Sequence, residues 1–301
     1  MPQASGSRHS MGYVLETVYG TTPATPAFKA IRHNSTSLNM GKNAFQSGEL
    51  RSDRQIADFR MGTTSVAGNF VGELSKDSYD DWLEAALGGT WTTNVLKTGL
   101  LRKSFTIERK FGDIGQYFRY TGMEVDTFQI GATTGGIIGV TFGLMGKGMS
   151  QSAAAIVGAT YPAAPTTSPM DALTGVLQEG GVTNAVVTEV TLNLNNNLNQ
   201  RYVIGSPDSL EPSIGRSNVT GTMTAFFEDA TLYGKFLTNT NSSLSFTASD
   251  GTNSFVFLVP KLKYTGGDVP VSGEGPVSIS MPFQGLYDSV TGTNLQITRA
   301  P

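Results

Sequence analysis

The sequence predicts a mainly β protein built from two tandem β-sandwich or barrel domains, each with one short flanking α-helix. Three short blocks recur in the same order in the two halves of the chain. Charged residues make up only 15% of the 301 residues, and 36 residues are Gly, which is typical of β-rich proteins with many turns. Because chance alignment rarely preserves the order of several elements, the recurrence favours an internal duplication.

The recurring blocks carry the duplication hypothesis. Each is a strand-like run in which apolar residues are interspersed with Gly, Asn, Ser or Thr. The pairs are SLNM at 37–40 with TLNL at 191–194, VAGNF at 66–70 with VTGTM at 219–223, and VTFGLMG at 140–146 with ISMPFQG at 279–285.

Composition divides the chain into four parts. Residues 1–30 are expected to form an N-terminal arm, because the Thr- and Pro-rich run at 20–27 offers too few backbone donors for a central strand. The two domains are expected at 31–149 and 183–301. Residues 150–182, which begin rich in Ala, Pro, Ser and Thr, predict a linker between them.

One short helix is predicted in each half. Over residues 77–87, apolar side chains recur with helical spacing and form one face, and Gly88-Gly89 follow as a stop signal. Over residues 230–237 a shorter helix is predicted, with Asp229 as its cap. Strands are predicted near 36–43, 64–74, 103–110, 117–129, 137–146, 243–248, 254–264 and 277–286.

A long loop is predicted at 44–62, and it concentrates charge in a chain otherwise poor in charge. Loops of this length inside compact domains are commonly functional. Charges of mixed sign suit a contact with complementary charges on a neighbouring subunit, so we expect this loop to take part in self-assembly. The charged residues are Glu49, Arg51, Asp53, Arg54, Asp58 and Arg60.

The residues that most enzymes need are scarce. There is no Cys, and the two His lie in or just after the arm, so thiol, Ser-His-Asp and transition-metal chemistry are disfavoured. The carboxylate pairs Glu73 with Asp77 and Glu124 with Asp126 are more often surface positions than the acid and base of a glycosidase. We therefore expect no catalytic, cofactor-binding or metal-binding residues and no enzyme.

Charge and hydropathy narrow the class further. The formal net charge of −3 argues against a basic nucleic-acid-binding protein. Residues 1–10 lack the apolar stretch of a signal peptide, and no apolar run approaches the ~20 residues of a spanning helix. Three interpretations remain open at this point: a self-assembling β protein, an outer-membrane-type β-barrel, and a carbohydrate-binding or hydrolytic β-sandwich.

Several segments together resemble the major tail tube proteins of bacteriophages with long non-contractile tails. They are the Gly-Thr-Pro run at 20–28, the strand and charged loop at 39–53, and the Gly-Asn-Phe of 68–70 leading into the helix-bearing run 79–89. The likeness covers most of 13–149. The second half is similar in the order of its elements.

The resemblance implies a structural virion protein of the tail, assembled in the cytoplasm of the bacterial host. Family members form rings that stack into a tube, through which DNA passes at ejection, and the long loop and terminal arm bridge successive rings. Members with one such fold per chain form hexamers, and members with two form trimers with pseudo-sixfold symmetry. The implied partners are further copies of the chain, the tape measure protein, the tail terminator and tip proteins, and phage DNA in transit without tight binding.

Overall fold

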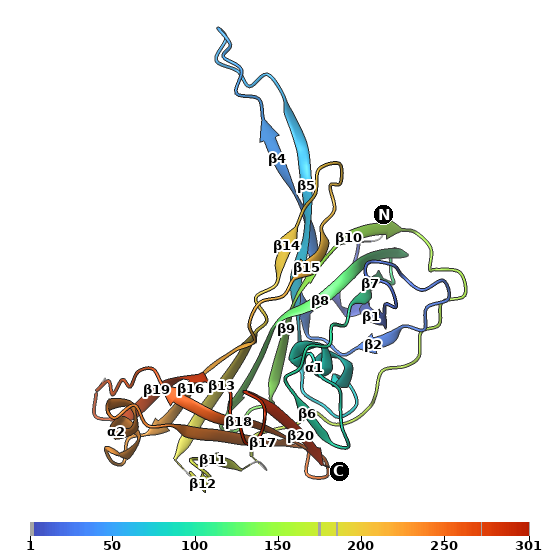
Figure 1. The fold of residues 1–301 in the computed structure, drawn as a ribbon. Helices are drawn as coiled ribbons and strands as arrows, with labels where there is room; N and C mark the ends of the chain where they lie inside the picture. The colour runs from blue at the N-terminus through green and yellow to red at the C-terminus, as the bar shows by residue number, and fades with distance from the viewer. Residues whose placement is uncertain (1–2, 174–175, 185, 272, 301) are drawn as a thin grey trace.

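The computed structural model describes residues 3–173, 176–184, 186–271 and 273–300. The predicted fold class is confirmed: the protein is mainly β, and each half contains one short α-helix. One long β-hairpin projects away from the body, and the two halves lie side by side at its base (Figure 1).

The first half holds a long, bent strand, β8, that takes part in two sheets. Its N-terminal part pairs with β7 and β10, and its C-terminal part pairs with β9. The elements are η1 Gly6–Arg8, β1 His9–Leu15, β2 Lys29–Ile31, β3 Ser35–Thr36, β4 Asn39–Gln46, β5 Phe59–Glu73, α1 Asp80–Leu87, β6 Val95–Lys97, β7 Phe105–Phe111, β8 Gln116–Thr133, β9 Gly139–Gly146 and β10 Gly148–Ser152.

The second half repeats the central part of this order, which is two strands, a helix and three strands, and adds a small hairpin of two short strands between the first two. Among its described residues there is no strand between α2 and β17 that corresponds to β6. That hairpin, β14–β15, forms a separate two-stranded sheet. The elements are β11 Leu177–Glu179, β12 Val182–Thr183, β13 Val187–Asn195, β14 Asn199–Arg201, β15 Leu210–Ser213, β16 Asn218–Phe226, α2 Thr231–Leu237, β17 Ser242–Ser249, β18 Ser254–Tyr264, β19 Ser278–Gly285 and β20 Gln296–Ala300.

A single antiparallel sheet runs through both halves. Its strand order is β4, β5, β9, β8, β13, β16 and β19, and the β8–β13 pairing joins the halves. The C-terminal strand β20 adds a second connection, because it pairs with β18 of its own half and with β6 of the first half.

The recurring blocks occupy corresponding places in this sheet. Met40 lies opposite Val66 in the first half, and Leu194 lies opposite Val219 in the second. Between the next two strands, Gly68 lies opposite Leu144, and Gly221 lies opposite Phe283. The equivalences are those of the sequence blocks, residue for residue.

An irregularity of pairing recurs as well. The β7–β8 ladder skips a residue of β8 between its Phe105–Met123 and Ile107–Tyr120 pairs, and the β17–β18 ladder skips one between its Ser242–Leu262 and Leu244–Val259 pairs. A bulge is a local feature that must be encoded at its own position. Its recurrence therefore extends the correspondence beyond the three blocks.

The helix α1 closes the core of the first half. Its apolar face, including Trp82 and Leu83, is fully buried against Phe70, Phe105 and Phe142. The helix ends at Gly88, whose left-handed φ of 65° suits a residue without a Cβ. The α2 helix differs, because none of its residues is fully buried. Asp229, which precedes α2, accepts a hydrogen bond from the amide of Thr231, the first residue of the helix.

Two details differ from the sequence-based expectations. Residues 44–46 and 59–62, expected to belong to a loop, continue β4 and β5, so the irregular part of the hairpin is only 47–58. Within the N-terminal 30 residues, β1 pairs with β7 along its whole length. The prediction of an arm was based on the composition of residues 20–27, which lie after β1, and this composition gives no information about the pairing of β1.

Candidate assembly surfaces

The most prominent surface is the long hairpin of residues 41–65. It is called the arm from here on and is distinct from the N-terminal arm predicted at 1–30. Its strands hold one another, and Phe45 packs directly over Gly62, where a Cβ would collide with the Phe45 ring. The arm exposes large apolar side chains, with Leu50 at 99%, Phe45 at 63% and Met61 at 61% exposure. Clustered exposed apolar groups on a projecting element mark an interaction site.

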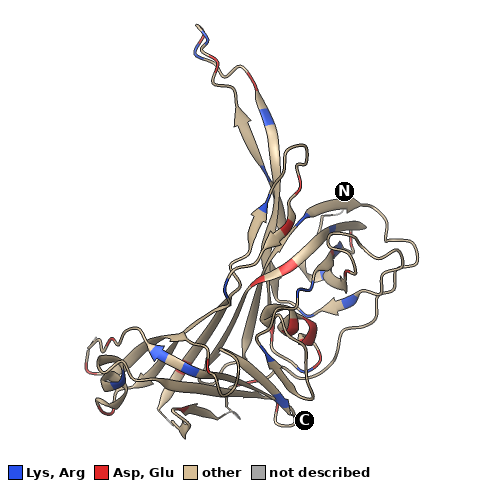
Figure 2. Ribbon diagram, viewed as in Figure 1, with Lys and Arg blue, Asp and Glu red and all other residues tan. Residues whose placement is uncertain are grey.

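The six predicted contact residues all lie on the arm. Five are in the tip loop and Arg60 is on β5, and Figure 2 shows this charge held far from the body. Arg51 and Asp53 form an exposed pair at 2.6 Å, and this hydrogen bond lowers the pKa of the Asp53 carboxyl. The sequence analysis did not identify the apolar residues of the arm, Phe45, Phe59 and Met61, as contact residues. Their positions among charged residues could have indicated them.

The second half carries a counterpart of the arm at residues 195–218, which folds back onto the first half. The Thr64 amide donates to the Pro207 carbonyl at 2.8 Å, and the Tyr202 hydroxyl donates to the Thr64 carbonyl at 2.8 Å. Ser65 also contacts Gln200 at 3.0 Å. The β14–β15 hairpin therefore grips β5 at the base of the arm.

An ion-pair cluster around the buried Glu124 fastens the same hairpin to the first half. Arg102 lies 2.6 Å from the buried carboxylate of Glu124 and 3.3 Å from Glu211, and it donates to the Pro212 carbonyl. Burial raises the pKa of Glu124, and Arg102 opposes that shift. Glu124 thus has a structural partner, and Asp126, the other member of the carboxylate pair considered above, accepts a hydrogen bond from the Leu198 amide.

The continuous sheet has one face on the core and one polar face. The polar face is formed by alternate residues of the strands and consists mainly of Ser, Thr, Asn, Gln and Gly. At these positions in the described chain there is no Lys or Arg, but Lys263 of β18 lies opposite Gln284 and therefore shares this face. The acidic residues Glu73 and Glu189 lie toward the end opposite the arm. The positions are 67, 69, 71, 73, 127, 129, 131, 139, 141, 143, 145, 189, 191, 193, 195, 220, 222, 224, 278, 280, 282 and 284.

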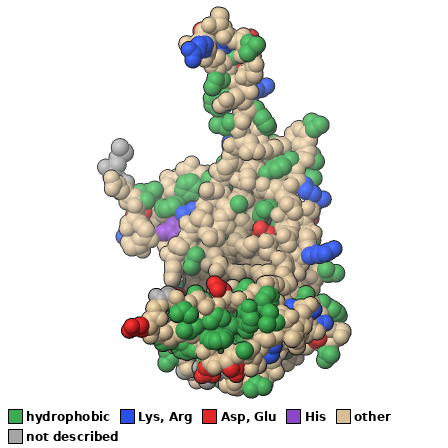
Figure 3. Space-filling view, turned by 90° about the vertical axis from the view of Figure 1, so that its left-hand side faces the viewer, with side chains coloured by type: hydrophobic (Ala, Val, Ile, Leu, Met, Phe, Trp, Pro, Cys, Tyr) green, Lys and Arg blue, Asp and Glu red, His purple; other side chains and the backbone are tan. Residues whose placement is uncertain are grey.

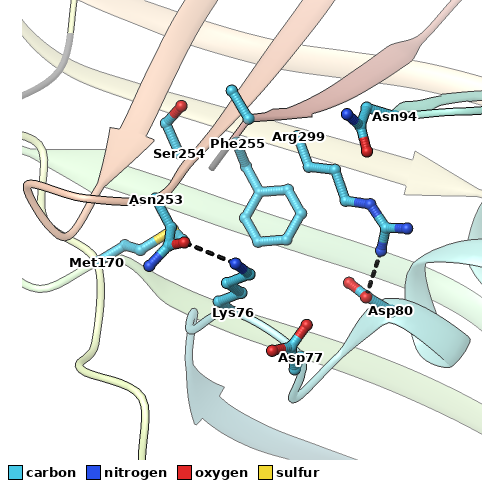
Figure 4. Close-up of a pocket in the computed structure, with 10 residues that line it drawn as sticks. Lys76, Asp77, Asp80, Asn94, Met170, Asn253, Ser254, Phe255 and Arg299 are labelled. Atoms are coloured by element: carbon cyan, nitrogen blue, oxygen red, sulfur yellow. Dashed lines mark hydrogen bonds and ion pairs between the residues drawn. The ribbon is translucent and has the colours of Figure 1, made fainter.

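The cavity in Figure 4, about 310 Å³, lies where the halves meet. Two pairs of its polar groups contact each other: Lys76 donates to Asn253 at 2.8 Å, and Arg299 pairs with Oδ2 of Asp80 at 2.5 Å, whereas the buried Oδ1 of Asp80 has no hydrogen-bond partner among the described residues. These contacts join the first half to the second. Among the described residues, no group of three or more His, Asp or Glu could hold a metal ion, and no helix is long and apolar enough to cross a membrane.

The fold and these surfaces define a structural β protein with a projecting interaction element. A family model described as phage tail tube protein matches residues 6–285. The chain therefore belongs to the phage tail tube protein family, is a structural component of the virion, and assembles with other tail components. The search of curated proteins found no match.

Proposed function

We propose that this protein self-assembles into stacked rings that form the tail tube, the conduit through which DNA is ejected into the host. The observation that carries the proposal is the β8–β13 pairing, which joins the two halves into one sheet, and at one end of this sheet β4 pairs with β5 alone among the described strands. Such a sheet can be extended by further copies until it closes, and closure removes exposed strand edges.

The matching registers of the two halves support two repeats of one fold in this chain, with domains at 31–149 and 183–301 joined by residues 150–182. β1 and β11 flank β7 and β17 in corresponding registers, since Tyr13 lies opposite Ile107 and Glu179 opposite Leu244. β11 and β12 therefore extend the second repeat into the segment predicted to be a linker, so that the proposed linker ends before β11.

Two repeats per chain make a ring of three chains with pseudo-sixfold symmetry the expected assembly. A tube wide enough for duplex DNA needs more strands than one chain supplies, and a family ring of six repeats needs three such chains. Native mass spectrometry of isolated rings is expected to give three chains. Six whole chains per ring would contradict the duplication argument.

The arm is the element that bridges successive rings. The arm carries Lys42, Arg51, Arg54 and Arg60 together with three carboxylates, so charges of both signs are nearly balanced on it, and its apolar side chains are free to be covered. Charges of both signs fix the register of a contact more than its strength, while the apolar groups supply affinity.

The polar face of the sheet is the surface that lines the bore. The core, the helices and the outer strands lie on the other side of the sheet, so closure places the polar face inside, with Asn193 among its residues. Cations bind phosphates and release counterions. A lining poor in cations and acidic at one end lets DNA slide without tight binding.

The role as a tube subunit accounts for the expected absence of catalysis, the other partners and the place of assembly. The chain performs no catalysis and needs no cofactor, and its carboxylates serve as structural ion-pair and hydrogen-bond partners. The tape measure protein fills the bore during assembly, the terminator and tip proteins close the tube ends, and assembly takes place in the host cytoplasm.

Negative-stain electron microscopy of the purified protein tests the proposal. Rings or stacked tubes with a central channel are expected, in increasing number as protein concentration rises. Featureless monomers at every concentration, or particles kept in solution only by detergent, would overturn it.

A further inference from the structure

The continuous sheet ends in two edges that face no other strand of the described chain. At one end, β4 pairs with β5 on one side only. At the other end, the segment after β18 keeps close to β19 through Asp268, which bridges to Ser280. β4 is exposed at nearly every position, whereas its counterpart β13, which has strands on both sides, alternates between buried and partly exposed positions.

The junction inside the chain is a template for what these edges can bind. In that junction Gln129 of β8 lies between Thr141 of β9 and Asn193 of β13. The block equivalences place Ser280 where Thr141 is and Asn39 where Asn193 is. Asp268, opposite Ser280, is therefore the counterpart of Gln129.

We propose that the two edges pair with each other between copies of this chain, with Asp268 of one chain opposite Asn39 of the next. The proposal rests on the proposed function and adds to it the residues and register of the seam between chains. The partner is a second copy, because its β4 carries the same block that the intrachain junction already accepts.

The directions of the backbone groups agree with this register. Asp268 and Ser280 exchange N–H···O bonds of 3.0 and 2.9 Å, so Asp268 directs its own groups toward β19. The Ser37 amide donates to Asn69 at 2.9 Å, and by alternation Asn39 also faces β5.

The neighbouring residues then present free groups to the seam. Gly267 and Met40 are one step from Asp268 and Asn39, so their N–H and C=O groups point away from their own sheets. In the proposed register these two residues lie opposite each other and form the hydrogen-bonded pair. Asp268 and Asn39 form the adjacent non-hydrogen-bonded pair, in which Cα atoms lie about 4.5 Å apart.

The surface beside the seam is apolar and uncovered. Tyr233 of α2 packs against Gly267, and Phe226 and Leu237 nearby in the second half are 44% and 66% exposed. Hydrophobic side chains gather on this lower part of the molecule in Figure 3. In the first half, α1 has its apolar face buried, so a neighbouring copy is expected to supply the cover that α2 lacks.

One contact sets where the pairing begins. The Leu38 carbonyl, on the same side of β4 as Met40, already accepts hydrogen bonds from Arg109 at 2.7 Å and from the Tyr120 hydroxyl at 3.1 Å. The seam therefore runs from Asn39 toward the arm.

A cysteine pair tests the register directly, because the chain has no Cys of its own. In the variant with Asn39→Cys and Asp268→Cys, mild oxidation of assembled protein is expected to link chains, since the predicted spacing suits a disulfide. A denaturing gel without reductant should show two and three linked chains and nothing larger. The matched control, Gln129→Cys with Asn193→Cys, spans the intrachain junction and should form its bond within one chain.

The possible results distinguish an error in the seam from an error in the proposed function. Tubes seen by microscopy without cross-links at 39 and 268 would overturn the seam and leave the proposed function standing. Absence of rings and tubes from wild-type protein would overturn the proposed function itself, and a ladder that continues to six chains would keep the seam and reject the trimer.

A second variant keeps the test independent of disulfide geometry. Met40→Pro removes the N–H that faces the seam, which an edge strand tolerates, so monomer folding by circular dichroism should be retained while ring formation is lost. Met40→Ala removes the same side chain but keeps the N–H and is expected to form rings. Equal assembly of the two variants would contradict the proposed pairing.

Discussion

The arm and the β14–β15 hairpin are corresponding segments of nearly equal length with opposite conformations. Residues 41–65 continue the ladder of β4 and β5 into solvent, whereas residues 195–218 leave the ladder of β13 and β16 and pack on the first half. The same scaffold position thus carries an outward-projecting hairpin in one half and an internal clamp in the other.

The divergence begins at corresponding residues. The β4–β5 ladder is irregular between Lys42 and Ala44 but resumes beyond that point. In the second half, Asn197 takes a left-handed φ of 52°, and the buried Asn196 amide donates to the Ala86 and Val125 carbonyls. These contacts turn the chain toward the first half.

The largest effect is expected from shortening the two segments separately. Replacing the tip residues 47–58 with Asn-Gly keeps the hairpin turn chemistry but removes the charged tip, so tube formation should be lost while rings remain. The matched control replaces 202–209 with Asn-Gly, which should lower the melting temperature through lost contacts to Thr64 and still permit ring stacking. Microscopy and calorimetry distinguish the two outcomes, and tubes of normal length from the tip-shortened variant would remove the arm from inter-ring contact.

Reversing charge on the arm sharpens the comparison without shortening it. The triple variant Arg51→Glu, Arg54→Glu, Arg60→Glu places like charges on an exposed tip, so it should stop tube growth and leave far-ultraviolet circular dichroism unchanged. Reversal of Arg8, Lys97 and Lys110, which lie on the body away from the proposed seam, makes the same charge change and is the control. If the arm variant polymerises like the wild type, the tip charges are only solvated surface.

The internal clamp is expected to contribute chiefly to stability. Arg102→Met leaves the buried Glu124 carboxylate without its ion-pair partner, which costs about 3 kcal/mol when a buried pair is broken. Thermal unfolding measures the loss. The double variant Arg102→Met, Glu124→Gln should recover much of it, since no buried charge remains; no recovery would mean that Glu124 is well solvated without Arg102.

The sequence was sufficient for the parts of the fold that are encoded locally. The apolar face around Trp82 and the alternation in 140–146 specify a helix and a half-buried strand without reference to other segments. The β8–β13 pairing could not be predicted in this way, because strand pairing depends on which distant edge is available. The same limit applies to Pro207 and Pro212, whose carbonyls accept hydrogen bonds from Thr64 and Arg102 in distant parts of the sequence.

The site was predictable to a similar degree. The six charged residues of the arm were recognisable because the rest of the chain is poor in charge. Arg102, Glu124 and Glu211 come from three distant segments, and only the fold brings them together. Composition can thus mark an exposed contact element, whereas a buried cluster needs the tertiary structure.

The strands β1 and β11 also differ, because only β1 contains a His, and this difference predicts a modest dependence of folding stability on pH. In β1, His9 accepts a hydrogen bond from Arg109 at 3.2 Å and lies 2.9 Å from the His33 ring nitrogen. β11 has no His. Burial, followed by the positive charge of Arg109 and the proximity of His33, lowers the pKa of His9 to about 4.

The unfolded chain protonates His9 below about pH 6.5, and the folded chain does so only below about pH 4. The contribution of neutral His9 to folding stability is therefore present above pH 6.5 and is lost as pH falls toward 4. Because His9 is partly exposed and solvent screens its interactions, we expect a loss of about 1–2 kcal/mol. Urea unfolding at pH 7 and pH 4.5 measures it. Other carboxylates titrate in the same range, so the relevant quantity is the difference between wild type and His9→Gln, which should show a smaller loss over this interval. Identical pH profiles for the two proteins would assign the acid sensitivity to groups shared by both repeats.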